Sequence, residues 1–144
     1  MSKSAIDKVA DYFKEDYNCC QSVLISLLEQ QDALFEEAPF IGAGFGGGII
    51  GRGEICGAVS GAIMAIGVLT GKTVKETVEH KEATKKIVSK FLEKFGATDC
   101  NDLLEIDEND PDARQKAADR GVFREKCPEF VKTAVQLVLE LLQE

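Results

Sequence analysis

Cysteine is the residue type of this 144-residue chain that points most directly to chemistry. Four of the five cysteines fall where the sequence predicts the first turn of a separate helix: Cys19, Cys56, Cys100 and Cys127. The free N–H groups and the positive dipole end of a helix N-terminus favour a thiolate over a neutral thiol. A thiolate of depressed pKa is the reactive form of cysteine and also its metal-binding form. Cys20 follows Cys19 directly, and we expect its side chain to point elsewhere because adjacent side chains on a helix diverge.

The spacing of the cysteines narrows their chemistry without deciding among the alternatives. No C-x-x-C pair is present, so the chain has neither the ligand spacing of a zinc knuckle nor the common redox motif. Any disulfide or metal site would therefore join segments that are distant in the sequence. The cysteines also fit a plain role as small buried core residues, which free cysteine often has.

Cys56 has the strongest case as a nucleophile because it follows a glycine-rich loop. Residues 42–53 hold seven of the thirteen glycines, so the backbone can adopt conformations that are closed to other residues. The loop has little side-chain bulk, which allows a substrate, a metal or another sulfur to approach. Arg52 would add positive charge near the thiol if the loop folds back.

The segment Ile55–Gly71 after this loop is predicted to form one helix at the centre of the fold. It carries no charge, and Gly57 and Gly61 lie four residues apart on one face. This face predicts the close approach of another backbone or of a cofactor. The segment reaches only the short end of the length range for a membrane span, and its glycines, serine and threonine lower its hydrophobicity. We therefore expect a buried helix and no membrane span.

Capped amphipathic segments cover most of the remaining chain. Together they predict an all-α bundle that forms a single domain over residues 1–144. Asn18 is predicted to cap a helix that starts at Cys19, and Gly96 and Gly121 are predicted to end helices. Thr98 or Asp99 is predicted to cap a short helical turn that contains Cys100.

Three further helix starts are predicted from local capping patterns. The segment 73–76 reads as a capping box that opens a helix ending at Gly96, with an apolar stripe of Val74, Val78, Ile87, Val88, Phe91, Leu92 and Phe95. Asp110–Pro111 and Cys127–Pro128 both read as a cap residue followed by proline at the first helical position. The second of these patterns places Cys127 at the start of the last helix.

Composition and charge exclude several classes of function. The net charge of −8 and the lack of a basic patch argue against nucleic acid or an anionic membrane as a partner. The first residues lack the apolar core of a signal peptide, so we expect a cytoplasmic protein. Overlapping G-x-G-x-x-G matches in the glycine loop lack the preceding strand and the later acidic residue of a dinucleotide site.

A family resemblance is carried by the segments around the cysteines. These segments are Asn18–Gln21, the glycine loop with Gly53–Gly61, Phe95–Cys100, and Cys127–Pro128. In them the chain resembles the C-GCAxxG-C-C family of putative redox-active proteins, small bacterial and archaeal proteins with four cysteines. The family label has Gly-Cys-Ala where this chain has Cys56-Gly57-Ala58. The resemblance implies that the four family cysteines are Cys19, Cys56, Cys100 and Cys127, with Cys20 as an extra one.

Three hypotheses of function remain open at this stage. The first is a thiol oxidoreductase or electron-transfer accessory, with Cys56 as the leading nucleophile and a redox partner protein that the sequence does not identify. The second is a metal centre, zinc or an iron–sulfur cluster, in which the four cysteines from separate helices serve as ligands. The third is a non-catalytic interaction protein whose Gly/Ala helix face packs against a partner or against a second copy in a homo-oligomer.

Overall fold

The computed structural model describes residues 4–71, 73, 75 and 77–144. In this part of the chain the structure consists of α-helices, one 3₁₀ turn and a single isolated β-bridge, with no strand. The predicted all-α class is thus confirmed. The helices are α1 (Ala5–Lys14), α2 (Cys19–Gln30), α3 (Ala38–Gly42), α4 (Gly57–Thr70), α5 (Val78–Phe95), α6 (Cys100–Leu104), α7 (Ala113–Asp119) and α8 (Val122–Leu142), and the 3₁₀ turn η1 spans Ala43–Phe45.

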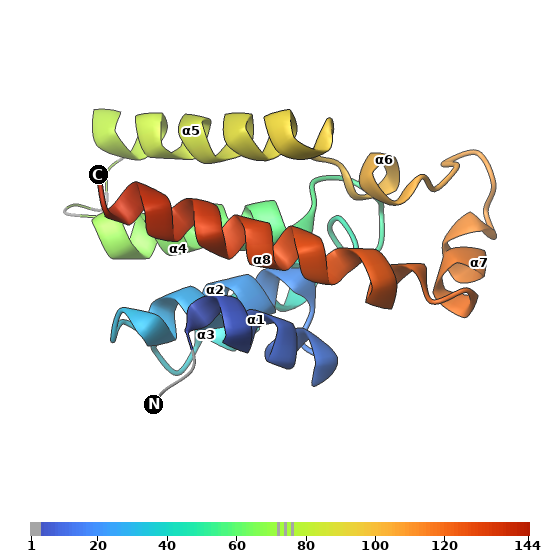
Figure 1. The fold of residues 1–144 in the computed structure, drawn as a ribbon, viewed down its shortest axis with the longest axis horizontal. Coiled ribbons are helices and arrows are strands. Elements are labelled where there is room, and N and C mark those ends of the chain that lie inside the picture. Colours follow the sequence, from blue (N-terminus) through green and yellow to red (C-terminus); the bar gives the residue numbers. More distant parts are fainter. Residues whose placement is uncertain (1–3, 72, 74, 76) are drawn as a thin grey trace.

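Helix α4 lies in the middle of the bundle, as the sequence predicted. Figure 1 shows α1 and α2 on one side of it, α5 on the other, and the long helix α8 running alongside. The helix packs against all three of α2, α5 and α8. Its side chains Ala58, Val59, Ala62, Ala65 and Ile66 are almost fully buried. A nearly uniform apolar helix of this kind is stable only where it is surrounded by protein.

Glycine on one face of α4 allows α2 to approach closely. A Cβ atom at Gly61 would lie 2.6 Å from the carbonyl oxygen of Cys20, and one at Gly57 would lie 2.9 Å from the amide nitrogen of Cys20. Both distances are too short for a side chain, so the two helices cross backbone to backbone. The contact sets the start of α2, and with it Cys19, beside the start of α4.

Several predicted helix ends are confirmed with their capping bonds. Asn18 accepts a hydrogen bond from the amide of Gln21 at 2.8 Å, and the Gln21 side chain accepts one from the amide of Asn18 at 3.0 Å. This is a complete capping box. Gly96 and Gly121 adopt left-handed backbone conformations with φ of 77° and 76°, which end α5 and separate α7 from α8.

The central helix is shorter than predicted at its N-terminal end. It begins at Gly57, and Cys56 is the cap residue before it, because Ile55 forms the isolated bridge with Asp99 instead of a helical turn. Gly71 caps its other end, as the sequence predicted, in an extended conformation with φ of −69°.

The last helix does not begin at Cys127–Pro128. Helix α8 starts at Val122, directly after Gly121, and Pro128 lies inside it. A proline this close to the N-terminus breaks only its bond to the carbonyl of Arg124 and fits the helical φ, so the helix continues through it. Cys127 therefore lies in the second turn and is not a cap residue.

The helix predicted at Asp110–Pro111 begins two residues later, at Ala113. The Asp110 carboxylate accepts a hydrogen bond from the amide of Asp112 at 2.9 Å, which forms a local turn ahead of the helix.

The capping box predicted at residues 73–76 includes Val74 and Glu76, which lie outside the described residues. Helix α5 is capped by Thr77, whose hydroxyl accepts a bond from the amide of His80 at 3.3 Å.

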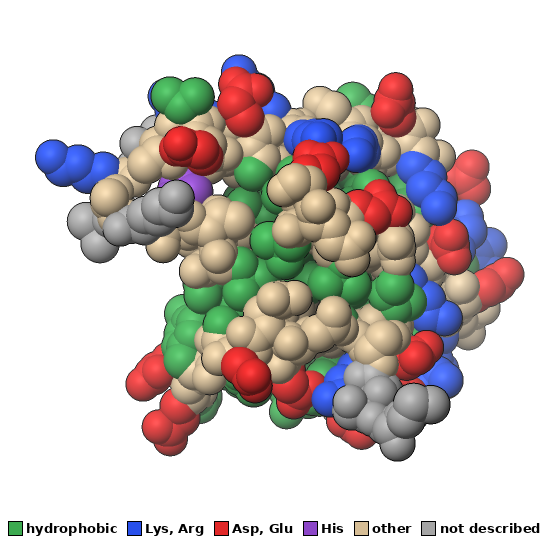
Figure 2. Space-filling model, turned by 60° about the vertical axis from the view of Figure 1, so that its left-hand side comes forward, with side chains coloured by type: hydrophobic (Ala, Val, Ile, Leu, Met, Phe, Trp, Pro, Cys, Tyr) green, Lys and Arg blue, Asp and Glu red, His purple; other side chains and the backbone are tan. Residues whose placement is uncertain are grey.

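The surface exposes several large hydrophobic side chains. On the face drawn in Figure 2, hydrophobic side chains gather at the centre and charged ones lie mainly around them. Two members of the predicted apolar stripe of α5, Val78 and Leu92, are exposed to solvent. The stripe prediction was wrong for these two residues. Among the described helices, none combines the length and the apolar character that crossing a bilayer requires.

Candidate functional site

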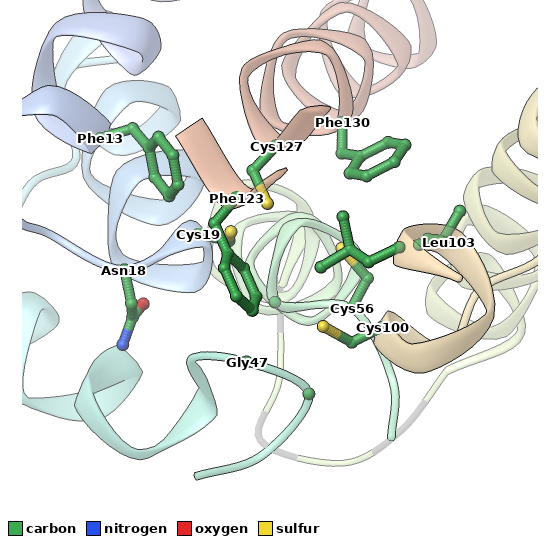
Figure 3. Close-up of a pocket in the computed structure, with 13 residues that line it drawn as sticks. Phe13, Asn18, Cys19, Gly47, Cys56, Cys100, Leu103, Phe123, Cys127 and Phe130 are labelled. Atoms are coloured by element: carbon green, nitrogen blue, oxygen red, sulfur yellow. The ribbon is translucent and has the colours of Figure 1, made fainter. Parts of the chain in front are cut away.

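Four of the five cysteines line one pocket at the end of the bundle where α2, α4, α6 and α8 meet. Figure 3 shows Cys19, Cys56, Cys100 and Cys127 around this pocket. The remaining lining is almost entirely apolar and comes from Phe13, Asn18, Gly47, Gly48, Gly57, Leu103, Leu104, Phe123 and Phe130. The cavity has a volume of about 100 Å³, which is well below the several hundred Å³ that a nucleotide-sized cofactor needs. It can hold a few heavy atoms, such as the sulfurs of an entering disulfide.

Cys56 and Cys100 are brought together by the isolated antiparallel bridge between Ile55 and Asp99. The amide of Cys56 donates to the carbonyl of Thr98 at 2.8 Å, and the amide of Cys100 donates to the carbonyl of Glu54 at 2.6 Å. Because side chains alternate along extended backbone, the residues that follow the bridge on each strand point to the same face. The bridge therefore directs both thiols into the pocket.

The glycine loop forms one wall of the pocket. Its backbone folds on itself through bonds from the amide of Gly53 to the carbonyl of Gly47 and from the amide of Glu54 to the carbonyl of Gly48. Gly48 has φ of 70°, and a Cβ atom there would lie 2.8 Å from the Cβ of Cys100. Only glycine fits between the loop and this cysteine. The predicted closeness of the loop to the chemistry is thus observed, although the neighbour is Cys100 as well as Cys56.

Cys19 and Cys127 form a second close pair, across the pocket from the bridge. Cys19 is the first residue of α2, and Cys127 lies in the second turn of α8. In Figure 3 their sulfur atoms turn toward each other. A hydrogen bond from the Cys19 thiol lowers the pKa of Cys127, and the charge of Arg114 lowers it further, against the opposing effect of burial. The pKa of Cys19 is raised, chiefly by the same bond.

A surface groove adjoins this pair. It has a volume of about 670 Å³ and is lined by Phe13, Lys14, Asp16, Tyr17, Arg124 and Pro128. Phe13 is shared between the groove and the cysteine pocket, and Pro128 directly follows Cys127. The groove is large enough for a segment of polypeptide, whereas the pocket behind it is not. Phe13 separates the two spaces.

Comparison with known proteins agrees with this cysteine arrangement. Residues 17–141 match the family described as "Putative redox-active protein (C_GCAxxG_C_C)". The chain belongs to this family. An uncharacterized protein of Archaeoglobus fulgidus is 29% identical over 145 residues, which cover 93% of this chain and 90% of that protein. No solved structure matches the chain.

The family's central motif corresponds to Cys56-Gly57-Ala58 and Gly61 in this chain, and the structure gives these residues distinct tasks. Cys56 contributes a pocket thiol, and Ala58 is fully buried. The two glycines lie against the start of α2, where a Cβ atom at Gly57 would be 3.0 Å from the Cβ of Cys19. The expectation that these glycines allow close approach is met by a helix of the same chain. Nothing in the pocket assigns them to a cofactor.

Cys56 is not the most acidic of the pocket thiols. Burial raises its pKa to about 12, although hydrogen bonds from the amides of Ala58 and Val59 at the helix start lower it. Desolvation therefore outweighs the helix terminus at a residue that is only 4% exposed. Arg52 does not compensate, because its side chain is exposed and pairs with Glu54 at 3.5 Å. These contacts therefore do not favour a thiolate at Cys56.

Arg114 is a residue of the candidate site that the sequence did not reveal. Its guanidinium lies 3.5 Å from the sulfur of Cys100 and is held by the side chain of Asn101 at 3.0 Å. It also stacks over the ring of Phe123 at 5.4 Å. The arginine lowers the pKa of Cys100, although burial, the larger effect, leaves that pKa raised. No pattern in the sequence connects an arginine in the short helix α7 with cysteines in other helices.

The geometry of the pocket cysteines bears on the metal hypothesis. In the described part of the chain, no three cysteine, histidine or acidic side chains are arranged so that they could hold one ion. The Cys19 and Cys127 thiols hydrogen-bond to each other instead of sharing a site with the other two thiols, so the arrangement does not fit zinc or a cluster held by all four. Cys20, the fifth cysteine, lies outside the pocket and contacts the sulfur of Met64 at 3.7 Å. Burial raises the pKa of Cys20 to about 12, which is typical of an inert core thiol.

Proposed function

We propose that this protein carries out thiol–disulfide exchange with a disulfide-bearing partner polypeptide through the Cys19–Cys127 pair. The observation that carries the proposal is the thiol–thiol contact between residues about a hundred positions apart, in a pocket that adjoins a surface groove. A reactive thiolate beside a second thiol is the arrangement that reversible disulfide chemistry requires. The family description names redox activity in general, and this exchange is a specific form of it.

The exchange proceeds in two steps that balance. The Cys127 thiolate attacks one sulfur of the partner disulfide, so a mixed disulfide forms and the other partner sulfur leaves as a thiolate. The Cys19 thiol then loses its proton to that thiolate or to water, and its sulfur attacks Cys127. The Cys19–Cys127 disulfide forms, the second partner thiolate is released, and two electrons have passed from the protein to the partner.

The groove beside the pair supports a polypeptide as the partner. Its lining contains the cations Lys14 and Arg124 and a single carboxylate, Asp16, in a chain with a net charge of −8. Pro128 has no N–H to donate, so the carbonyl of Arg124 lacks its helical donor at the edge of the groove. A main-chain amide of an extended partner segment can supply that donor. This hydrogen bond to the main chain would contribute to the affinity for the partner polypeptide. The disulfide of the bound partner would then pass Phe13 to reach Cys127.

Trapping of the mixed disulfide tests this proposal. Reduced protein would be mixed with an oxidised peptide that contains one disulfide, and the adducts would be located by mass spectrometry. The Cys19→Ser variant is expected to accumulate the peptide on Cys127, because the resolving thiol is absent. The Cys127→Ser variant is expected to lose the reaction, and the Cys20→Ala variant is expected to behave as wild type, because Cys20 lies outside the pocket.

Two results would overturn the proposal. One is a Cys127→Ser variant that reduces the peptide at the wild-type rate. The other is stoichiometric zinc or iron in wild-type protein purified without oxygen, with all four pocket thiols protected from alkylation until the metal is removed. The second result would establish the metal hypothesis in its place.

A further inference from the structure

We infer that Cys56 and Cys100 form a second dithiol couple, which lies behind the first and reduces the Cys19–Cys127 disulfide within the molecule. This inference rests on the proposed exchange function and extends it. One chain would then deliver four electrons to partner disulfides instead of two. The inner couple acts as an electron reserve that never meets the partner directly.

The backbone around the bridge brings these two residues to one face of the pocket. Cys56 and Cys100 are diagonal neighbours on one face of the Ile55–Asp99 bridge, held by the two short hydrogen bonds to Thr98 and Glu54. Both side chains lie on the same face of the bridge, and the two thiols are close enough for the charge of Cys100 to raise the pKa of Cys56. In Figure 3 both side chains point into the pocket from the side opposite Cys19 and Cys127.

The inner couple is enclosed by the chain. Cys56 is 4% exposed and Cys100 is 7% exposed, so both are about as buried as Cys127 at 4%, and none of these three thiols lines the surface groove itself. Gly48 covers Cys100 so closely that not even a methyl group fits between them. The groove approaches the Cys19–Cys127 pair first, because its lining includes Pro128, which directly follows Cys127, and no residue next to Cys56 or Cys100. The inner thiols open only onto the pocket that all four sulfurs share.

Arg114 positions the inner couple for attack. Its guanidinium donates to the sulfur of Cys100 at 3.5 Å, while Asn101 fixes it from the other side at 3.0 Å. Gly47 leaves the space that the arginine occupies, since a Cβ atom there would be 3.2 Å from a guanidinium nitrogen. Arg114 does not line the pocket itself, so it acts on the pocket thiols, on Cys100 by direct contact and on Cys127 through its charge, and not on the partner. A cation at this distance favours the thiolate of Cys100 over its neutral thiol.

The internal step balances without an outside reagent. The Cys100 thiolate attacks the Cys19–Cys127 disulfide, and a mixed disulfide forms while the second sulfur of the outer couple leaves as a thiolate. Cys56 loses its proton to that thiolate, and its sulfur attacks Cys100. The Cys56–Cys100 disulfide forms, and Cys19 and Cys127 return to the dithiol state. Two electrons have moved from the inner to the outer couple, and a second partner disulfide can then be reduced.

Electron counting with the oxidised peptide tests the inference directly. Fully reduced wild-type protein, freed of reductant, is expected to reduce two peptide disulfides per chain and to end with the disulfides Cys19–Cys127 and Cys56–Cys100 by peptide mapping. The Cys100→Ser variant is expected to reduce only one. A wild-type protein that reduces one disulfide would overturn the second couple but leave the proposed function intact. A wild-type protein that reduces none would overturn the proposed function itself.

The role of Arg114 can be tested by comparing the rates at which the first and the second peptide disulfide are reduced. The Arg114→Gln variant is expected to slow the second equivalent by about tenfold at neutral pH, because a pKa change of one unit changes the thiolate fraction tenfold. It should slow the first equivalent less, because Arg114 contacts Cys100 directly and acts on Cys127 only through its charge. The loss should disappear as the pH is raised, which a merely structural defect would not produce. Arg52→Gln is the matched control, since Arg52 is exposed and pairs only with Glu54 among the contacts described. Equal slowing by both variants at every pH would overturn the positioning role.

Discussion

The contact between α2 and α4 can be tested with two alanine substitutions in one helix. Gly61 and Gly67 both lie in α4, but a Cβ atom at Gly61 would be 2.6 Å from the carbonyl oxygen of Cys20, whereas one at Gly67 would meet nothing within 4 Å. Alanine gains about 1 kcal/mol over glycine in a helix at either position. The helix propensity therefore cancels in the comparison, and only the packing differs.

The size of the packing difference follows from the distance. A carbon–oxygen contact is ordinarily about 3.3 Å or longer, so the Gly61→Ala methyl group forces the backbones apart by roughly 0.7 Å. Overpacking of this kind costs about 1–3 kcal/mol. We expect Gly67→Ala to stabilise the protein by about 1 kcal/mol. The free energy of unfolding of Gly61→Ala should lie about 1–3 kcal/mol below that of Gly67→Ala.

Urea unfolding followed by circular dichroism measures both variants against wild type. For a chain of this size, the melting temperatures of the two variants should also differ by about 3 °C for each kcal/mol. The m-values should agree, because the same surface is exposed on unfolding. If Gly61→Ala is as stable as Gly67→Ala, then α2 and α4 do not cross backbone to backbone, and the placement of Cys19 beside Cys56 loses its basis.

Three further substitutions test the site and its surroundings. Gly57→Ala places a methyl group 3.0 Å from the Cβ of Cys19, so it should slow formation of the Cys19–Cys127 disulfide more than Gly61→Ala does, as measured by the rate of thiol loss with the oxidised peptide. Stability should fall as the pH rises from about 9 toward 12, because the buried Cys20 and Cys56 keep protons that the unfolded chain releases, and each group contributes up to about 1.4 kcal/mol per pH unit. Cys20→Ala should make that slope in urea unfolding shallower, and an unchanged slope would refute the raised pKa of Cys20. Ile50→Asn should stabilise the protein by about 0.5–1 kcal/mol in thermal unfolding, because Ile50 is 77% exposed and has a left-handed φ of 47°, which asparagine tolerates better than a β-branched residue does.

The sequence predicted those features of the fold that depend on local residue patterns. The cap at Asn18, the left-handed glycines 96 and 121, and the buried Gly/Ala helix were all visible in residue types and periodicity. These features are confirmed because each is determined within about one helical turn. The prediction that the cysteines act together rested on four predicted helix starts and on the family resemblance. The fourth helix start, at Cys127, was wrong, yet Cys127 lines the same pocket.

The pairing of the cysteines depends on contacts that no local pattern encodes. A two-residue bridge between positions 55 and 99 leaves no strand signature, although it places Cys56 beside Cys100. Helix α8 runs on through Pro128, and its second turn carries Cys127 to the start of α2. Arg114 reaches Cys100 only because Gly47 leaves room for it. Each contact joins segments that are distant in the sequence, so their proximity could not be anticipated from spacing.

The stability of the oxidised protein distinguishes an exchanging disulfide from a structural one. A Cys19–Cys127 bond would close a loop of roughly 110 residues, and chain entropy alone predicts a stabilisation of about 4.7 kcal/mol for a loop of about that length. The folded reduced protein already holds these two thiols in contact, yet an exchange protein must release the bond easily. A strained Cys19–Cys127 disulfide is reduced easily, and the strain lowers the stabilisation that the disulfide gives to the folded protein.

In the Cys56→Ser variant, which leaves only the outer couple able to close, we expect oxidation to raise the free energy of unfolding by less than about 2 kcal/mol. The measurement compares urea unfolding of the oxidised and reduced forms. A gain near the full entropic value would mean an unstrained disulfide that resists reduction, and the Cys19–Cys127 pair would then hold the bundle together and not exchange electrons.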